Sequence, residues 1–254
     1  MDSNGNVQSI DRVFDIVEAL SSHGNELTIA QLCEITNLNK STVHRMLSSL
    51  KNRGYAVQTI SGSYRLTFKF CSLSQRIIND VSILPSVLPH LRKLSSSVQE
   101  IVHFVIQDNS NTVYLDRLEP LNSYYRSTVN IGMSRPLHTS AGGKIILAMQ
   151  GEDAWKQYWE NADKTPTTPY TITTYERLQK EMLLFSSQQY ATEFEENTLG
   201  FSCVAVALTD QYNHKNYAIT LSSLKVLMTP EHIQEILPIL LETKAQIQRD
   251  IGFQ

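Results

Sequence analysis

The sequence predicts an α+β protein in which a small helical module with a β-hairpin precedes a larger domain built on an antiparallel sheet. Helical periodicity dominates the first eighty residues, whereas beyond Ser97 strand-like runs alternate with helical segments. With 254 residues the chain is long enough for two domains. The predicted divisions are a disordered tail over residues 1–6, a winged helix-turn-helix domain over 7–68, a linker helix over 69–82 and a second domain over 83–254.

The first forty residues contain several residues that typically begin or end helices. Val7 to Ser22 has apolar residues at helical spacing, and Gly24 ends that helix. Thr28 is an N-cap residue for a second, short helix, with Gln31 at the third helical position as in a capping box. A tight turn then leads to Asn39, a good N-cap for a third helix. The pattern therefore predicts three consecutive helices.

The third helix, Asn39 to Arg53, leads into a hairpin. Its apolar residues recur at helical spacing, which predicts one buried stripe. These residues are Val43, Met46, Leu47 and Leu50. Gly54 stands where a helix C-cap is expected, and Ser61-Gly62 lies between two short alternating runs, which is a hairpin signal. A helix followed by such a hairpin is the second half of a winged helix-turn-helix.

The opposite face of this helix carries side chains that can reach base edges and phosphates of DNA. From Lys40 to Asn79 the chain has seven lysines and arginines and no acidic residue, although its net charge is -3. Such a stripe of one sign is typical of a surface that binds a polyanion, and the alternative is a set of ordinary solvated cations. We expect Ser41, Thr42, His44 and Arg45 near bases, and Lys40, Lys51, Arg53 and the wing residue Arg65 near phosphates.

Cysteine usage and hydropathy point to a soluble protein of the cytoplasm. The three cysteines, Cys33, Cys71 and Cys203, lie far apart and form no CxxC pair, so no disulfide framework is predicted. The polar N-terminus lacks an apolar signal core, and the longest apolar runs are too short to span a bilayer.

Beyond the winged helix, the pattern predicts a helix over Leu66–Val81 and a further helix from Ile83 to Leu94 that Pro89 bends. Strands and helices then alternate, which suggests a twisted antiparallel sheet flanked by helices. The predicted strands are 101–107, 112–118, 124–129, 203–208 and 217–222, and the predicted helices are 140–149, 175–188 and one from Pro230 to near Gly252.

One concentrated candidate site lies in the second domain. The run from Pro136 to Lys144 enters a helix whose first turn is small residues, so the amides of Ala141, Gly142 and Gly143 could approach a bound anion, most naturally a carboxylate. The alternative is that small residues merely let this helix pack closely on a sheet. The sequence favours neither.

Other kinds of active site find no support. Gly143-Lys144 lacks the spacing of a phosphate loop, and Ser134 lacks the last glycine of a nucleophile elbow. The seven histidines show no HxxxH or HExxH arrangement, so neither a metal nor a cofactor is expected. The acidic run is interpreted as a solvated turn before a strand; its members are Glu193, Glu195 and Glu196.

Taken together, these residues resemble the IclR family of bacterial transcription regulators over nearly the whole chain. In the first domain the matching runs are Gln8 to Arg12, Lys40 to Arg45, Arg53 to Tyr55 and Tyr64 to Leu66. In the second they are Gly132, Pro136 to His138, Gly143-Lys144, Leu147-Ala148, Glu195 to Asn197 and Leu199 to Ala205. The resemblance implies a winged helix-turn-helix joined by a linker helix to a GAF-like effector domain, assembled as a homodimer or a dimer of dimers.

The resemblance also implies an effector pocket. Carried over by motif, it is lined by the Ala141 and Gly142 amides, Glu193 in the acidic loop, Phe201, Cys203, Thr220 and Ser222. Amides and hydroxyls would hold a carboxylate, and the Glu193 carboxylate would accept hydrogen bonds from ligand hydroxyls. Relatives commonly have Asp where Glu193 stands, which leaves the ligand open. Cys203 is interpreted as a pocket wall rather than a nucleophile.

These observations predict a repressor that binds a palindromic double-stranded operator and responds to a small carboxylate such as a sugar acid or keto acid. Ile219 to Ser223 and Tyr158 to Glu160 look most like members that control sugar-acid and ketogluconate catabolism. One rival is an enzyme that processes carboxylic acids and carries the winged helix as an appendage, and another is a protein-interaction module. The effector, the operator and its genes, the sign of the ligand effect and dimer against tetramer stay open.

Overall fold

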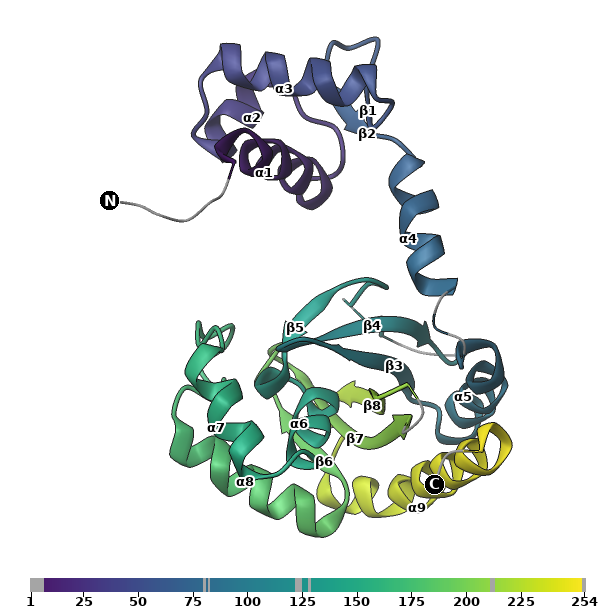
Figure 1. The fold of residues 1–254 in the computed structure, drawn as a ribbon. Coiled ribbons are helices and arrows are strands. Elements are labelled where there is room, and N and C mark those ends of the chain that lie inside the picture. Colours follow the sequence, from purple (N-terminus) through teal and green to yellow (C-terminus); the bar gives the residue numbers. More distant parts are fainter. Residues whose placement is uncertain are drawn as a thin grey trace. The chain divides into compact units, whose positions relative to one another are not determined.

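The computed structural model describes residues 7–79, 81, 83–121, 125–127, 129–210 and 213–252. It divides into two compact units, Met1–Val81 and Ser82–Gln254 (Figure 1). The predicted disordered tail over residues 1–6 lies outside the described part. Within the described ranges, no helix is long and apolar enough to cross a membrane.

The first unit consists of three helices and a hairpin packed around one apolar core. Its elements are α1 (Gln8–Ser22), α2 (Ile29–Thr36), α3 (Lys40–Asn52), β1 (Ala56–Gln58) and β2 (Tyr64–Leu66). The two strands pair antiparallel, and Tyr64 of β2 packs in the same core as Leu20, Leu32 and Leu47 of the three helices. This is the predicted winged helix-turn-helix.

The predicted capping residues are confirmed. The Thr28 hydroxyl accepts from the Gln31 amide while the Gln31 side chain accepts from the Thr28 amide, which is a full capping box. The Asn39 side chain accepts from the Thr42 amide at 2.9 Å. Gly54 follows α3 with φ +76°, the left-handed conformation that glycine adopts without a Cβ penalty.

Helix α4 (Lys69–Asn79) is fastened at its start to the winged helix. The Thr67 hydroxyl donates to the Gly54 carbonyl at 2.6 Å, and the Lys69 ammonium donates to the Arg53 carbonyl at 2.6 Å. The predicted helix over Leu66–Val81 is therefore shorter than expected, because Leu66 belongs to β2 and Thr67 makes the turn out of the hairpin.

The second unit is a six-stranded antiparallel sheet in the order β5-β4-β3-β8-β7-β6. The strands are β3 (Ile101–Asp108), β4 (Asn111–Leu118), β5 (Ser134–Pro136), β6 (Ala191–Phe194), β7 (Phe201–Asp210) and β8 (Lys215–Leu224). The helices are α5 (Leu84–Val98), α6 (Ala141–Ala148), α7 (Glu152–Asn161), α8 (Tyr175–Gln188) and α9 (Pro230–Ile251), with a 3-10 turn η1 (Leu137–Thr139) before α6. The predicted α+β class is confirmed.

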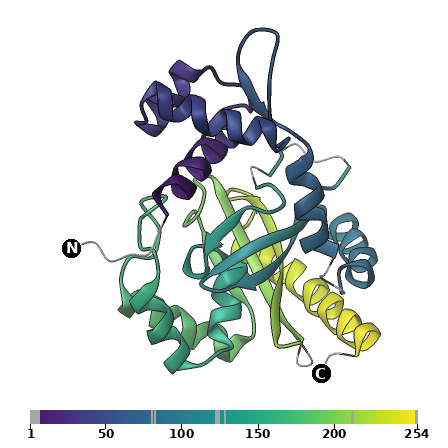
Figure 2. The ribbon, with the colours of Figure 1, turned by 45° about the horizontal axis from the view of Figure 1, so that its top comes forward.

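Helices cover both faces of this sheet. Helix α6 packs on one face, where Ile145 shares a core with Val105 of β3 and Ala218 of β8. Neighbouring strand residues such as Phe104 and Ile219 point to the opposite face because side chains alternate along a strand. Helices α5 and α9 lie side by side and contact the sheet through β3 and β7 (Figures 1 and 2).

Two details of the sheet differ from the prediction. The segment predicted as a strand over 124–129 forms none in its described residues, 125–127 and 129. The Arg117 guanidinium donates to the carbonyls of Ser127 and Val129 at 3.4 and 2.5 Å. A side chain therefore holds this segment in place of the backbone hydrogen bonds that a strand would make. Strand β6, in turn, includes Glu193, which was expected in a loop.

Candidate DNA-binding surface and effector cavity

The predicted DNA-contacting residues lie on α3, except for Arg53, which follows its last residue, and Arg65, which belongs to β2. Seven of the eight are exposed: Lys40, Ser41, His44, Arg45, Lys51, Arg53 and Arg65. Within the described residues, no carboxylate forms an ion pair with Lys40, Arg45 or Lys51, so these cations are available to phosphates. Figure 1 shows β1 and β2 directly after α3, as in a winged helix.

Thr42 is the exception. Its side chain is only 8% exposed, so the expectation that it faces outward with its neighbours is wrong. The reason is its position on the helix: Thr42 stands one turn before Met46, on the edge of the buried stripe. Its amide also serves the Asn39 cap.

A small cavity lies over the sheet of the second unit. Its volume is about 30 Å³, which is room for one or two water molecules. One row of paired strand positions crosses its floor, from Ile101 in β3 through Ser222 and Cys203 to Glu193 in β6. The lining residues are Ile101, His103, Tyr114, Ser127, Val129, Glu193, Asn197, Thr198, Phe201, Cys203 and Ser222.

A chain of hydrogen bonds runs along this lining. His103 Nε2 lies 3.0 Å from the Ser127 hydroxyl, and His103 Nδ1 lies 3.2 Å from the Ser222 hydroxyl. The Ser222 hydroxyl in turn lies 3.0 Å from Cys203 Sγ. Burial, helped by the charge of Arg117, lowers the pKa of His103 to about 3, so its imidazole is neutral at physiological pH. His103 was not predicted, because nothing nearby in the sequence marks it.

Glu193 is buried in strand β6 and is 2% exposed. Its Oε1 accepts hydrogen bonds from the amides of Glu196 and Asn197 at 2.5 and 3.1 Å. Burial raises the pKa of this carboxyl, while Lys144 and the two amides oppose the rise. The interpretation of the acidic run as a solvated turn is therefore wrong, because Glu195 and Glu196 are also buried.

Close packing accounts for the glycines at the start of α6. A Cβ on Gly143 would lie 2.2 Å from the Leu137 carbonyl oxygen, and one on Gly142 would lie 2.9 Å from the Thr220 hydroxyl. Of the predicted pocket residues, the structure brings Glu193, Phe201, Cys203 and Ser222 together in the cavity lining. Ala141, Gly142 and Thr220 lie in the adjoining packed layer beneath α6 and do not line it.

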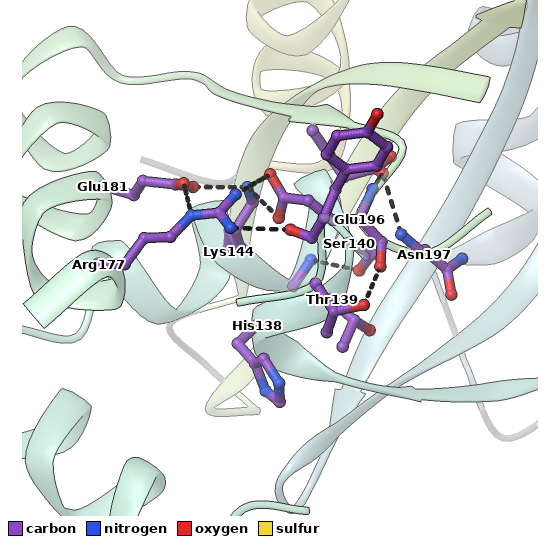
Figure 3. Close-up of polar contacts among 12 residues, drawn as sticks. His138, Thr139, Ser140, Lys144, Arg177, Glu181, Glu196 and Asn197 are labelled. Carbon is purple, nitrogen blue, oxygen red and sulfur yellow. Dashed lines mark hydrogen bonds and ion pairs between the residues drawn. The ribbon is translucent and has the colours of Figure 1, made fainter. Parts of the chain in front are cut away.

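A buried ion-pair network behind the cavity was not predicted (Figure 3). Lys144 of α6 is fully buried, and its ammonium donates to Glu196 at 2.8 and 2.9 Å and to Glu181 of α8 at 2.6 Å. Burial alone would lower the pKa of Lys144, but the Glu196 and Glu181 carboxylates outweigh it and raise that pKa. Arg177 lies 3.5 Å from Glu181 and 3.7 Å from Glu196. The sequence signal that could have predicted this network is Lys144 itself, a lysine inside an otherwise apolar helix.

Further hydrogen bonds hold the backbone next to the two amides that donate to Glu193. The Thr168 hydroxyl donates to the Glu195 carbonyl at 2.6 Å, and the Thr171 hydroxyl donates to the Glu196 carbonyl at 2.7 Å. With the side chain of Glu196 bound to Lys144, residues 195–196 are held from both sides. The amides that bind Glu193 are thus placed by contacts outside the cavity.

These groups favour binding over covalent chemistry. Burial, with Glu193 nearby, raises the pKa of the Cys203 thiol well above its usual range, so the thiol stays protonated. An imidazole with a pKa of about 3 is a poor general base near neutral pH. Among the described residues, no group of three or more His, Cys, Asp or Glu side chains could hold a metal ion.

The neutral state of His103 predicts acid sensitivity. Below pH 6.5 the unfolded chain protonates this histidine and the folded protein does not, so the free energy of unfolding falls as the pH drops from about 6.5 to about 3. The fall is at most about 1.4 kcal/mol per pH unit for one group. In His103→Gln, urea unfolding between pH 7 and 4.5 should show a slope shallower by up to that amount. Equal slopes in both proteins would contradict the assignment.

The fold and these surfaces define a class: a winged-helix DNA-binding regulator with a second, sheet-based domain. Comparisons with known proteins identify the family. The profile of the IclR helix-turn-helix domain matches residues 9–59, and that of the bacterial transcriptional regulator IclR C-terminal domain matches residues 75–249. The chain belongs to the IclR family of bacterial transcriptional regulators.

Relatives of known sequence and structure agree. Over 249 residues the chain is 34% identical to the DNA-binding transcriptional repressor YiaJ of Escherichia coli (strain K12), covering 97% of this chain and 88% of that one. The crystal structure of Thermotoga maritima IclR superposes with a TM-score of 0.77 at 25% identity, covering 97% and 100% of the two chains. An IclR homolog from Microbacterium hydrocarbonoxydans, complexed with 4-hydroxybenzoate, has the same fold, with a TM-score of 0.78 at 18% identity and coverage of 97% and 100%.

Proposed function

We propose that this protein is a cytoplasmic repressor whose affinity for a palindromic operator is modulated by a small carboxylate, such as a sugar acid or keto acid. The observation that carries the proposal is the pairing of two separate features in one chain. One unit exposes a basic helix face without acids, and the other contains a small cavity whose lining includes buried polar side chains. Coupling between such sites is typically about 1–3 kcal/mol, or a five- to hundredfold change in affinity.

On DNA, α3 enters the major groove. Ser41, His44 and Arg45 stand on its exposed N-terminal half and reach base edges, with Arg45 suited to a bidentate contact with guanine. Lys40, Lys51, Arg53 and Arg65 contact phosphates. Thr42, being buried, contributes to the placement of α3 through the Asn39 cap.

The effector binds in the second unit. Its carboxylate is directed toward the first turn of α6 at Ala141 and Gly142, which adjoins the cavity and which the ligand reaches when the cavity widens, because the amides of a helix N-terminus favour negative charge. Glu193, Phe201, Cys203 and Ser222 hold the rest of the molecule. Because the cavity has a volume of about 30 Å³, it widens to admit a sugar acid or keto acid. The 4-hydroxybenzoate bound by the Microbacterium homolog is also a carboxylate, which supports this class of effector.

We further propose that two copies of the chain associate through the first unit. Ile10 and Phe14 of α1 and its N-cap residue Val7 are exposed at helical spacing, each more than half accessible, and α4 exposes Leu73 and Ile77 one turn apart. Apolar stripes of this kind mark association surfaces. A twofold pair of winged helices reads a palindrome, which is the operator type that we propose.

Phe14→Glu is expected to weaken this association by tenfold or more, because it places a charge in an apolar contact. Sedimentation of the full chain over a range of concentrations measures the shift from dimer to monomer. Glu18→Gln, on the same helix, is the matched control and should leave the mass unchanged. A Phe14→Glu protein that sediments as the parent does would place the contact elsewhere.

The proposal as a whole is tested by selecting genomic duplex fragments on the purified protein at two salt concentrations, with and without a panel of sugar acids and keto acids. The expected result is an enriched palindrome whose affinity falls with salt and shifts with one acid. If no sequence is enriched, the DNA-contacting role of α3 is wrong. If a palindrome is enriched and no acid shifts it, the effector class is wrong.

A further inference from the structure

Two hydrogen-bond acceptors, on Asn197 and Glu193, belong to the lining of the cavity in the second unit. Asn197 lines it, and among the described residues no group hydrogen-bonds to the buried Oδ1 atom of this side chain. A buried acceptor without a partner is costly, typically about 1–3 kcal/mol. Its presence in the lining therefore points to a donor that arrives with the ligand. Figure 3 shows Asn197 beside the buried ion-pair network.

Glu193 is a second acceptor in the same lining. Its Oε1 is already engaged by two backbone amides, so the carboxylate is held in place by the chain itself. An ionised carboxylate only accepts hydrogen bonds. Among the described residues that line the cavity, none is a lysine or arginine, and Lys144 acts on Glu193 from outside the lining. A ligand group that faces Glu193 is therefore a donor, because a second carboxylate would meet a like charge.

The hydrogen-bond chain of the lining points the same way. The Ser127 hydroxyl oxygen accepts from the Val129 amide at 3.0 Å, which leaves the hydroxyl hydrogen for His103 Nε2. The neutral imidazole then donates from Nδ1 to Ser222, and Ser222 donates toward Cys203, whose thiol donates to Glu193. The donors of this hydrogen-bond chain are thus used within it and do not compete with the ligand for Asn197 and Glu193.

We propose that the effector is a hydroxy acid whose hydroxyl groups donate hydrogen bonds to Asn197 and Glu193, and that Asn197 is the residue that selects it over keto and unsubstituted acids. The inference rests on the proposed effector function of this cavity and narrows it. A keto oxygen offers only acceptor lone pairs, so a keto acid leaves Asn197 Oδ1 unpaired as before. A hydroxyl supplies the missing donor.

The test measures dissociation constants by calorimetry on the full chain for two series of fixed length. The three-carbon series is propionate, pyruvate, lactate and glycerate, and the six-carbon series is hexanoate and gluconate. Affinity should rise about fivefold for each hydroxyl that finds an acceptor, and pyruvate should bind no better than propionate. The informative quantity is the ratio of the dissociation constants of two acids in one series. A variant that weakens the binding of all acids equally leaves this ratio unchanged.

Variants at position 197 assign the preference to Asn197. Asn197→Leu keeps the backbone amide that serves Glu193 but removes the acceptor, and should lower the glycerate-to-propionate or gluconate-to-hexanoate ratio about fivefold. Asn197→Asp keeps an acceptor and should retain the ratio even where its charge weakens all acids. Asn161→Leu, on the exposed surface of α7, is the matched control and should leave both constants unchanged.

The outcomes separate this inference from the proposed function. If an acid without hydroxyls binds as tightly as its hydroxylated counterpart and shifts operator affinity, the selectivity is wrong and the effector function stands. An unchanged ratio in Asn197→Leu likewise overturns the role of this residue. If no acid of either series binds or changes operator affinity, the proposed effector function fails together with the inference.

Discussion

Replacing Lys144 by methionine is expected to lower the free energy of unfolding by about 3–5 kcal/mol, because it leaves the buried Glu196 carboxylate without its main cation. The Glu181 carboxylate of α8 loses the same partner. Methionine fills a volume close to that of the lysine stem, so the loss reports charge rather than a cavity. Urea unfolding followed by circular dichroism measures it.

Two further variants sharpen this prediction. Lys225→Met removes a half-exposed lysine that pairs with Glu195, and should cost far less stability than Lys144→Met because solvent screens the exposed pair. The double variant Lys144→Met/Glu196→Met removes both charges of the buried pair, and should be more stable than Lys144→Met alone. If Lys144→Met and Lys225→Met cost the same, the buried network does not stabilise the fold in the way its geometry indicates.

Replacing Arg45 by alanine is expected to weaken binding to the selected operator by about 1–3 kcal/mol, which is roughly five- to 150-fold, and to relax the preference at one base pair. Arg45 is exposed on α3, and among the described residues no carboxylate forms an ion pair with its guanidinium. Fluorescence anisotropy with the operator and with single-base variants measures both effects.

The companion variant separates phosphate contact from base contact. Lys51→Ala should weaken all duplexes about equally and reduce the salt slope by about 1. Lys180→Ala, an exposed lysine of α8 in the other unit, should change neither affinity nor slope. An Arg45→Ala protein with full affinity and unchanged base preference would exclude α3 as the helix that reads sequence.

Local signals predicted the first unit because its features are set by near neighbours. Thr28 with Gln31, Asn39 and Gly54 each act within one helical turn, and all three caps are found in the structure. The prediction for Thr42 was wrong because helical periodicity finds the centre of a buried stripe but does not define its edges. A residue at the edge of an apolar stripe can face either way, and packing decides.

The candidate site of the second unit depends on contacts between distant residues. Lys144 meets Glu196 52 positions later, and His103 meets Ser222 119 positions later, so no local pattern marks either pair. Strand β6 is four residues long, too short for alternation to identify it. The run after Leu118 was mistaken for a strand because its fixing partner, the Arg117 side chain, is invisible to periodicity.

The small volume of the cavity has a kinetic consequence. A space of about 30 Å³ holds water but no organic acid, so only a widened, less populated form of the second unit can take up its ligand. Rapid-mixing traces should then show an association rate that levels off at high ligand concentration, at the rate of opening. The apparent dissociation constant exceeds the intrinsic one by the inverse of the open fraction, so substitutions that loosen the lining raise sensitivity to the ligand without touching it.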